Sequence, residues 1–558
     1  MTVQLSLALS NPVLRSKPPS EKTGQVFTRS WVVDAVLDLA GYVETVDLAT
    51  KRAVEPAAGE GAFLTEMARR LVASCRLHGR HVSEAASSIV AYELDDGVAD
   101  SARSATSLVL RDAGVPTSAA EALVDGWIRS ADYLLTGLAL PAPADFVIGN
   151  PPYIRLEDVP ADTAGTYRAM YPTMRGRADI YVAFFEAALL QLRSGGVVAF
   201  ICADRWMLNA YGADLRRLVT SAYGVEVVVE MHNAPAFEDD VSAYPAVVVI
   251  RSAPQARCLI ASVSGDVDTG PDGFTAERLL AAADGSPAAG LRGVRAGYAD
   301  GWYSGAEPWP LGSPDRLRTL QYLEANFHSL EDGSTRVGIG VATGADSVFV
   351  TKDPTEVEKS RLLPLAMASD TADGTLRWSG HYLVDPWAPE GLVDLAEYPR
   401  LAAYLADHEA VLRSRNVAGR NPRAWYRTID RVAHGLTPMS KLYFPDIKGF
   451  AHPVLDRGKT YPHHNLYWVT STRWDLEVLG GILLSRVAQF FVECYSVRMR
   501  GGALRFQAQN LRRIRVPAPN AISPELADRF RTAFRDRDQA SATAAALVAY
   551  GLDALPED

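Results

Sequence analysis

The chain has 558 residues, which is more than one ordinary domain holds and suggests about two to four domains. It is 48% hydrophobic and 22% charged, and this average composition excludes wholesale disorder. No apolar run reaches the roughly 18 residues of a membrane span, and the first 22 residues lack the basic segment and cleavage site of a secretory signal. The four cysteines, Cys75, Cys202, Cys258 and Cys494, lie too far apart for a zinc knuckle or a disulfide framework. We therefore expect a cytoplasmic protein without a metal centre.

Charge is distributed unevenly along the chain. The net charge is −10, yet residues 411–515 contain 18 Lys and Arg against 6 Asp and Glu. This local excess of +12 leaves −22 for the remainder. Such asymmetry predicts one region that meets a polyanion.

After an N-terminal arm, residues 1–23, the first organised region runs from residue 24 to 254. Helical spacing of apolar residues predicts helices, which we place at 32–43, 60–77 and 179–193. Apolar runs predict buried strands, which we place at 52–56, 88–96, 144–150, 196–203, 225–231 and 246–252. Buried strands that alternate with helices are typical of a doubly wound α/β sheet.

The rhythm changes after about residue 255, where stretches rich in Gly, Pro and Ala replace the alternating pattern. We expect a connecting region at 255–330 and a separate mixed α+β domain at 331–558. Ser523 and Pro524 predict the start of a helix that ends near Tyr550.

The first chemical signal is the segment from Glu55 to Phe63, which joins a strand to a helix. Its glycines, Gly59 and Gly61, allow a ligand to approach the backbone at the carboxyl end of the sheet. The spacing fits neither a dinucleotide fingerprint nor a P-loop. An acid before the glycines disfavours a phosphate and favours a ligand with an ammonium or sulfonium charge, and Glu93, which closes the next strand, suits ribose hydroxyls. The alternative is a tight turn with no ligand.

The second signal is Asn150-Pro151-Pro152-Tyr153, which follows a buried strand. Prolines stiffen this turn and donate no hydrogen bond, which makes the Asn150 amide oxygen and the Pro151 carbonyl available as acceptors. Two acceptors beside an aromatic face suit the exocyclic amino group of a flat heterocycle. The alternative is an ordinary Asn-Pro turn in which Tyr153 is a packing residue.

Together these motifs resemble the adenine-N6 DNA methyltransferases of the gamma motif order, the Taq-type modification enzymes, in which a Rossmann-like domain uses S-adenosylmethionine. The resemblance covers the catalytic half in sequence order, from Gly24–Thr28 through Asn150–Tyr153 to Ala236–Glu238 before Ser242 and Ala243. It implies cofactor contacts for Thr28, Glu55, Pro56, Ala57, Gly59, Gly61, Phe63, Glu93, Leu94, Asp132, Tyr133 and Asn150. It implies that Asn150, Pro151, Pro152 and Tyr153 are catalytic, and that Tyr153 and Phe237 cover the two faces of the target base.

The activity that this resemblance implies is methyl transfer from S-adenosylmethionine to N6 of an adenine flipped out of double-stranded DNA. We expect a monomer that serves a restriction-modification or phage-defence system, with any nuclease encoded separately, since residues 1–23 are too few for a nuclease domain. Methyltransferases that act on RNA or on release-factor glutamines also carry this tetrapeptide, but they are generally far shorter. A third alternative is a DNA-binding specificity subunit without catalysis, against which the intact motifs argue.

The C-terminal half accounts for the positive excess. Val337–Asp346 resembles the opening segment of a target-recognition region in these methylases. Two arginine-rich groups follow, and arginine suits phosphates and guanine edges, whereas glutamine can recognise adenine. The expected DNA-binding residues are Arg413, Arg415, Arg420, Arg423 and Arg427 in the first group, and Arg498, Arg500, Arg505, Gln507, Arg512, Arg513 and Arg515 in the second. The alternative is a set of solvated helix faces.

Overall fold

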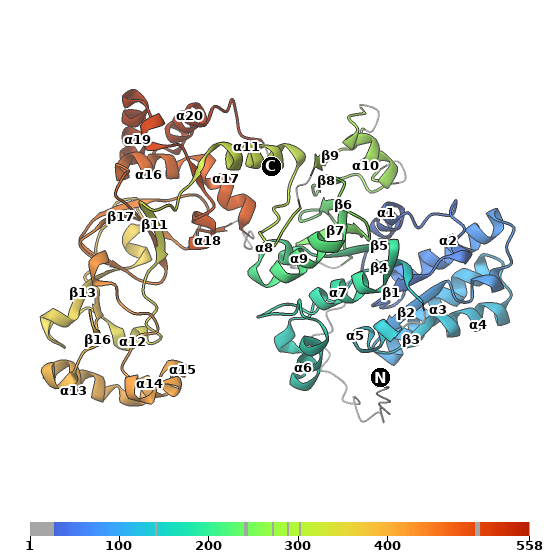
Figure 1. Ribbon diagram of the computed structural model, residues 1–558, viewed down its shortest axis with the longest axis horizontal. Coiled ribbons are helices and arrows are strands. Elements are labelled where there is room, and N and C mark those ends of the chain that lie inside the picture. Colours follow the sequence, from blue (N-terminus) through green and yellow to red (C-terminus); the bar gives the residue numbers. More distant parts are fainter. Residues whose placement is uncertain are drawn as a thin grey trace, which may run out of the picture. The chain divides into compact units, whose positions relative to one another are not determined.

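The computed structural model describes residues 27–139, 142–238, 244–270, 273–286, 290–300, 303–496 and 503–556. The chain forms two compact units, Met1–Pro314 and Asp315–Asp558, which Figure 1 shows in sequence colours. The expected arm at 1–23, Gly24–Val26, Ser242, Ala243, Arg498 and Arg500 lie outside the described residues.

The first unit contains a nine-stranded mixed sheet in the order β3-β2-β1-β4-β5-β7-β6-β8-β9. Its strands are β1 (Ala53–Glu55), β2 (Ile89–Glu93), β3 (Ile128–Ser130), β4 (Ala144–Gly149), β5 (Leu192–Ala203), β6 (Gly224–Glu230), β7 (Pro245–Arg251), β8 (Arg257–Val263) and β9 (Val294–Asp300). Strands β3, β2, β1, β4 and β5 pair in parallel. Because β7 is antiparallel to both β5 and β6, β6 runs in the same direction as β5. The carboxyl ends of β1, β2, β4, β5 and β6 therefore lie at one edge of the sheet.

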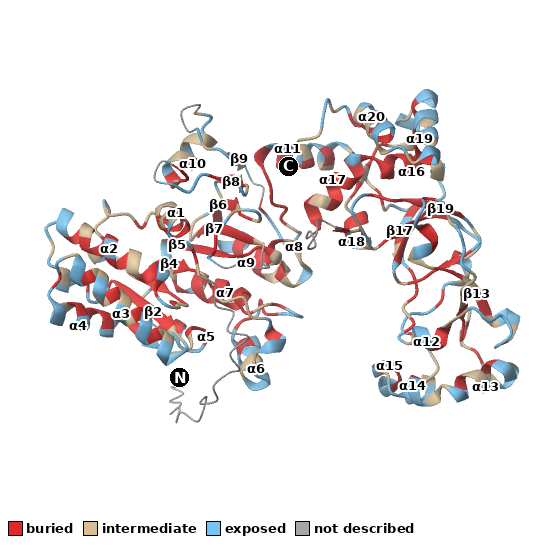
Figure 2. Ribbon diagram, turned by 180° about the vertical axis from the view of Figure 1, so that it is seen from behind, coloured by how far each residue is buried: buried red, intermediate tan, exposed pale blue. Residues whose placement is uncertain are grey.

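Helices cover both faces of this sheet, since β1 and almost all of β4 and β7 are buried. The helices are α1 (Ser30–Ala40), α2 (Ala62–Leu77), α3 (Asp96–Asp112), α4 (Thr117–Trp127), α5 (Tyr133–Thr136), α6 (Ala161–Met170), α7 (Tyr181–Gln191), α8 (Arg205–Leu208), α9 (Ala213–Ala222) and α10 (Ala276–Ala283). Both α1 and α7 pack on β5, from opposite sides of the sheet in Figure 1. Figure 2 shows the central strands buried and the outer sides of α3 and α4 exposed. This arrangement confirms the expected doubly wound α/β fold.

The sheet extends further along the chain than we expected. The predicted end at residue 254 and the predicted connecting region from 255 are wrong for this part, because β8 pairs in parallel with β6 and β9 pairs with β8. In β9 only Gly297 is buried, so an edge strand of this kind lacks the apolar run that marks a buried strand.

The second unit contains small sheets and helices, as expected for a mixed α+β domain. One four-stranded sheet has the order β11-β21-β17-β19 and another the order β12-β14-β13-β20. Their strands are β11 (Thr335–Ile339), β21 (Leu466–Ser471), β17 (Ser440–Pro445), β19 (Val454–Arg457), β12 (Val350–Thr351), β14 (Tyr382–Val384), β13 (Leu362–Ala366) and β20 (Tyr461–Pro462). Three strand pairs complete it: β10 (His328–Ser329) with β23 (Arg515–Val516), β15 (Trp387–Ala388) with β16 (Gly391–Leu392), and β18 (Ile447–Lys448) with β22 (Leu504–Arg505).

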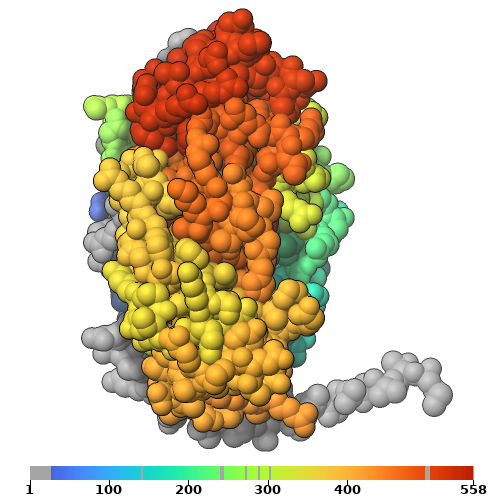
Figure 3. All heavy atoms as spheres, turned by 90° about the vertical axis from the view of Figure 1, so that its left-hand side faces the viewer, coloured from blue at the N-terminus to red at the C-terminus, as the bar shows by residue number. Residues whose placement is uncertain are grey.

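The helices of this unit are α11 (Pro314–Asn326), α12 (Asp346–Phe349), α13 (Pro399–Asp407), α14 (Glu409–Arg413), α15 (Asn416–Arg420), α16 (Leu476–Leu484), α17 (Arg486–Tyr495), α18 (Ala508–Leu511), α19 (Pro524–Asp536) and α20 (Gln539–Tyr550). Figure 3 shows α19 and α20 in red at one end of the unit and its yellow and orange segments at the other. Among the described residues no single helix has the length and apolarity to cross a membrane, and α16 with α17 passes that test only as a pair bent by 62°.

The single C-terminal helix predicted from Ser523 to about Tyr550 is in fact two helices. Ser523 does cap α19, accepting a hydrogen bond from the Leu526 amide. The chain then turns at Arg537, which has a left-handed φ of 58°, and Asp538 caps α20 by accepting from the Ser541 amide. The capping residue Asp538 marks the break between the two helices, which the spacing of apolar residues alone does not reveal.

Candidate active site

The predicted site residues of the first unit follow strands whose carboxyl ends share one edge of the sheet. Glu55 ends β1, Glu93 ends β2, and Asn150 follows β4. A Cβ placed on Gly149 would lie 3.4 Å from Pro56 Cδ and 3.5 Å from Glu55 Cγ. The end of β4 is therefore in contact with the glycine loop that follows β1.

The glycine loop has the backbone that its sequence predicts. Gly59 and Gly61 have φ values of 56° and 96°, in the left-handed region that favours glycine. The Gly59 amide donates to Glu93 Oε2 at 2.9 Å, while Glu93 Oε1 accepts from the Leu94 and Asp95 amides. One carboxylate thus holds the loop after β1 against the end of β2.

Glu55 stands out because it is buried, with 1% of its surface exposed. Its Oε2 atom has no hydrogen-bond partner among the described residues. Burial, with a smaller effect of the nearby Glu93, raises the pKa of Glu55 well above its ordinary value. A buried carboxyl without a protein donor is a place for a positively charged or hydrogen-bond-donating ligand group.

The other residues predicted to contact a cofactor are placed differently. Asp132 caps α5, accepting from the Leu134 and Leu135 amides, and its Oδ2 accepts from the Tyr167 hydroxyl at 2.5 Å; burial raises its pKa. Leu94 is 68% exposed. Pro56 is buried and Ala57 is partly exposed.

Two of these residues have buried aromatic side chains. Tyr133 is 2% exposed, and its hydroxyl donates to Gln191 Oε1 at 2.9 Å within the core. Phe63, also 2% exposed, packs into the core cluster beneath the sheet. Both aromatic side chains are packed in the protein interior in this structure.

The Asn-Pro-Pro-Tyr turn is held by a segment that precedes it by more than a hundred residues. Asn150 Nδ2 donates to Thr28 Oγ1 at 3.2 Å, and Thr28 is only 6% exposed. A primary amide donates through nitrogen and accepts through oxygen. The hydrogen bond to Thr28 therefore directs the accepting end of the Asn150 amide away from Thr28.

A third segment joins this pair. Thr28 forms a β-bridge with Phe237, flanked by backbone hydrogen bonds from Arg29 to Ala236 and from Glu238 to Phe27. The rings of Phe237 and Tyr153 lie 6.3 Å apart, edge to face, at an interplanar angle of 73°. The Tyr153 hydroxyl donates to the Ile201 carbonyl at 3.4 Å, and burial raises the pKa of Tyr153 so that it stays neutral. The three segments that the sequence analysis selected thus meet at one place.

Known proteins match the chain along almost its full length. It is 43% identical to the type II methyltransferase M.PaeR7I of Pseudomonas aeruginosa over 544 residues, 95% of this chain and 92% of the relative. It is 41% identical to the type II methyltransferase M.XhoI of Xanthomonas vasicola over 547 residues, 97% of this chain and 99% of the relative. The chain belongs to the type II restriction-modification methyltransferases.

A family model and a solved structure also match the chain. The sequence model of the Eco57I restriction-modification methylase family matches residues 143–237, which include the Asn-Pro-Pro-Tyr turn and Phe237. The solved structure of the type IIL restriction-modification enzyme MmeI in complex with DNA covers 93% of this chain and 71% of its own, with a TM-score of 0.53 and 11% identity. At that identity the likeness shows the fold alone.

The candidate site has a charged neighbour that the sequence analysis missed. Asp204 follows β5 and His232 follows β6, at the same edge of the sheet. His232 Nε2 lies 2.6 Å from Asp204 Oδ2, and its Nδ1 lies 2.9 Å from Glu230 Oε1. Burial opposes protonation, but the two carboxylates outweigh it and raise the pKa of His232 to about 10. The signal available in the sequence was an ionisable residue directly after each of two predicted parallel strands.

Most of the described arginines that were predicted to bind DNA make contacts within the second unit. Arg415, Arg427, Arg505, Arg512 and Arg515 have protein partners in the structure. Arg415 donates to the carbonyls of Leu412, Thr343, Trp425 and Arg427. Arg427 donates to the Thr428 and Ile429 carbonyls, Arg505 to Asp446, Arg512 to Glu331 and the Val337 carbonyl, and Arg515 to Ser329. Gln507 places its amide 3.2 Å from the Arg505 guanidinium.

The other four described arginines of the predicted DNA-binding set differ in whether they have a protein partner. Arg413 pairs with Glu409 and stacks over Trp425, and Arg513 stacks over Tyr495. Arg420 and Arg423 are exposed, and no side-chain hydrogen bond or ion pair engages them within the described part of the chain. Most of the described arginines predicted to bind DNA therefore make contacts within the protein, while Arg420 on α15 and Arg423 in the turn after it are exposed without such contacts among the described residues.

Proposed function

We propose that this type II methyltransferase transfers a methyl group from S-adenosylmethionine to N6 of an adenine that is flipped out of double-stranded DNA. Methylation of DNA is the activity of the family as a whole. The target base, the target atom and the methyl donor are our proposal.

The observation that carries the proposal is the hydrogen bond between Thr28 and Asn150. The lone pair of an adenine N6 amino group is delocalised into the ring, which makes it a poor nucleophile. Asn150 Oδ1 and the Pro151 carbonyl would accept the two amino hydrogens and draw the nitrogen towards tetrahedral geometry. Thr28 fixes the orientation of the amide in advance, so that the acceptor needs no reorganisation during the reaction.

The cofactor proposal depends on the two acids of the glycine loop. The buried, unpartnered Oε2 of Glu55 suits an ammonium group, and Glu93 at the end of β2 suits ribose hydroxyls. S-adenosylmethionine carries a sulfonium-bound methyl group, which is the group to be transferred. Asp132, at the carboxyl end of the neighbouring β3, is the remaining candidate for a contact with the adenine part of the cofactor.

The aromatic pair supports recognition of a flat base. Tyr153 and Phe237 approach from different segments and meet edge to face. Stacking a base on one aromatic ring is worth about 1–3 kcal/mol, comparable with the few kcal/mol that flipping a base costs. Tyr153 is neutral at physiological pH, so it offers an uncharged face.

The test is to label DNA with a radioactive methyl donor, digest the product and identify the methylated nucleoside by mass spectrometry. N6-methyladenine supports the proposal, whereas N4-methylcytosine or C5-methylcytosine would contradict it. Ribosomal RNA and a release factor serve as parallel substrates. Asn150→Ala should abolish transfer to DNA and leave the affinity for S-adenosylmethionine nearly unchanged, because the glycine loop is a separate element.

A further inference from the structure

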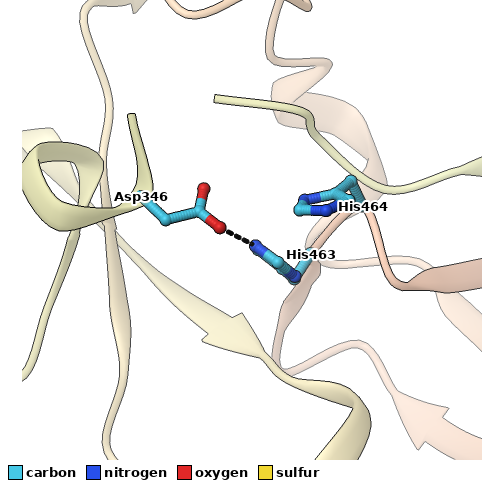
Figure 4. Close-up of side chains that lie close together, drawn as sticks. All are labelled: Asp346, His463 and His464. Carbon is cyan, nitrogen blue, oxygen red and sulfur yellow. Dashed lines mark hydrogen bonds and ion pairs between the residues drawn. The ribbon is translucent and has the colours of Figure 1, made fainter. Parts of the chain in front are cut away.

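The second unit contains a cluster of metal-ligating side chains that the methyltransferase site does not use. Asp346, His463 and His464 each place one ligating atom within 4.8 Å of the ligating atoms of the other two. Figure 4 shows the Asp346 carboxylate facing His463, with His464 beside them. Asp346 is 117 residues from His463 in the sequence, and the expectation of no metal centre rested on the spacing of the cysteines alone.

The backbone around the cluster brings two distant segments together. Val341 and His463 form a parallel β-bridge, and the His463 amide donates to the Ala366 carbonyl at 3.0 Å. A Cβ on Gly340 would lie 2.1 Å from the His463 carbonyl oxygen, so only glycine permits this approach. The segment that carries Asp346 is thus held directly against the one that carries both histidines.

The side chains are oriented as ligands of a cation would be. Thr343 Oγ1 donates to Asp346 Oδ1, and Asp346 Oδ2 lies 3.0 Å from His463 Nε2. The two imidazole rings lie 4.1 Å apart. Asp346 is half-exposed while His463 is buried, so one side of the cluster is open to an arriving ion.

Two nitrogen atoms in this cluster are unsatisfied. The Nδ1 atoms of His463 and His464 are buried and have no hydrogen-bond partner in the described part of the chain. Buried polar atoms in folded proteins are almost always paired. His463 faces Asp346 through Nε2, and one imidazole binds an ion through one nitrogen, so the unpaired atom that bears on this site is Nδ1 of His464. A free lone pair there, beside an imidazole and a carboxylate, points to a ligand that accepts electron pairs.

We propose that Asp346, His463 and His464 form a Zn²⁺ site that fastens the segment at 340–346 to the segment at 461–464. Imidazole and carboxylate ligands without thiolate suit zinc. Zinc sites with three protein ligands keep a fourth, tetrahedral position for water, which the open side provides. Ligand distances of about 2.0–2.2 Å require the three side chains to close slightly around the ion. Thr343 orients the carboxylate, as partners of metal ligands commonly do.

The experiment uses the full-length chain, stripped of metal with a chelator and then equilibrated with zinc sulfate by dialysis. Bound zinc is measured by mass spectrometry, and thermal unfolding is recorded with and without zinc. The wild type should bind one zinc per chain and unfold at a higher temperature when zinc is present. Both effects should be lost in His464→Gln and Asp346→Asn, whose side chains are at least partly exposed and whose replacement leaves the core intact.

The chain offers a matched control. His434 Nε2 lies 2.6 Å from Asp385 Oδ2, and among the described residues no third ligating side chain joins that pair. His434→Gln should therefore retain zinc binding, whereas Thr343→Val should weaken it by roughly 10- to 100-fold. Equal zinc binding by His464→Gln and the wild type, or no zinc in the wild type, would overturn the proposal.

Discussion

Replacing Thr28 by valine tests whether the site is organised by the hydrogen bond to Asn150. Valine keeps the shape of the side chain and removes Oγ1, which accepts from Asn150 Nδ2 at 3.2 Å. Thr28 is 6% exposed, so the lost acceptor cannot be replaced freely by bulk water. Losing one such hydrogen bond costs about 0.5–1.5 kcal/mol, and since 1.4 kcal/mol corresponds to a factor of ten, kcat should fall roughly 2- to 12-fold.

The assay separates catalysis from binding. Single-turnover methyl transfer with saturating donor reports the chemical step, and calorimetry reports the affinity for S-adenosylmethionine. We expect the loss in Thr28→Val to appear in the rate, with cofactor affinity changed little. Thr28→Ser, which keeps the hydroxyl, should recover most of the rate.

Two results would refute this reasoning. If Thr28→Val transferred methyl groups at the wild-type rate, Asn150 would be oriented by other contacts. If its entire defect lay in cofactor affinity, Thr28 would act as the cofactor contact that the family resemblance implies, and the hydrogen bond to Asn150 would be incidental.

Three further predictions concern charged groups. Burial raises the pKa of Glu55, and a cationic ligand would favour its ionised form. Cofactor binding should therefore release a proton, seen as a buffer-dependent heat that Glu55→Gln abolishes; a buffer-independent heat in the wild type would contradict this. The folded-state pKa of His232 is raised to about 10, so its stabilisation is complete below the unfolded-state pKa of about 6.5 and is lost as pH rises towards 10. The free energy of unfolding of the wild type relative to His232→Gln should fall over that range by at most about 1.4 kcal/mol per pH unit, and parallel pH profiles would exclude it. Replacing Arg420 and Arg423 by glutamine should flatten the slope of log DNA affinity against log salt by about 0.9 per lost phosphate contact, while Arg529→Gln, an exposed arginine on α19, should leave the slope unchanged; equal slopes for all three proteins would remove DNA from this surface.

The fold was predictable where burial is continuous and not where it is partial. Runs such as Ala144–Gly149 and Pro245–Arg251 are almost wholly apolar because helices cover both faces of the strand. The edge strand Val294–Asp300 is mostly half-exposed, and its composition resembles a loop. The helix at 96–112 also escaped prediction, since small or polar residues, Ala99, Ala102 and Thr106, form most of its buried face.

The site was predictable where one short segment carries the chemistry. The backbone geometry of the acid-and-glycine loop and of the Asn-Pro-Pro-Tyr turn can be predicted from the segments themselves, because glycine permits and proline restricts backbone conformations. The hydrogen bond from Asn150 to Thr28 joins residues that are 122 positions apart, and no local sequence pattern predicts it. It became visible only through the pairing of the segments around Thr28 and Phe237.

The number of charged residues in a segment can be read from the sequence, but their contacts in the folded protein cannot. The excess of arginine between residues 411 and 515 is real, but composition does not reveal which cations are already satisfied inside the protein. Arg415 donates to four backbone carbonyls, a role in organising the loop that its place in an arginine-rich segment does not reveal. Conversely, Asp204 and His232 carry no motif, yet the topology alone brings them to the edge where Asn150 lies, because the carboxyl ends of parallel strands share one side of a sheet. A sequence search that follows each predicted parallel strand to its next ionisable residue would have found both.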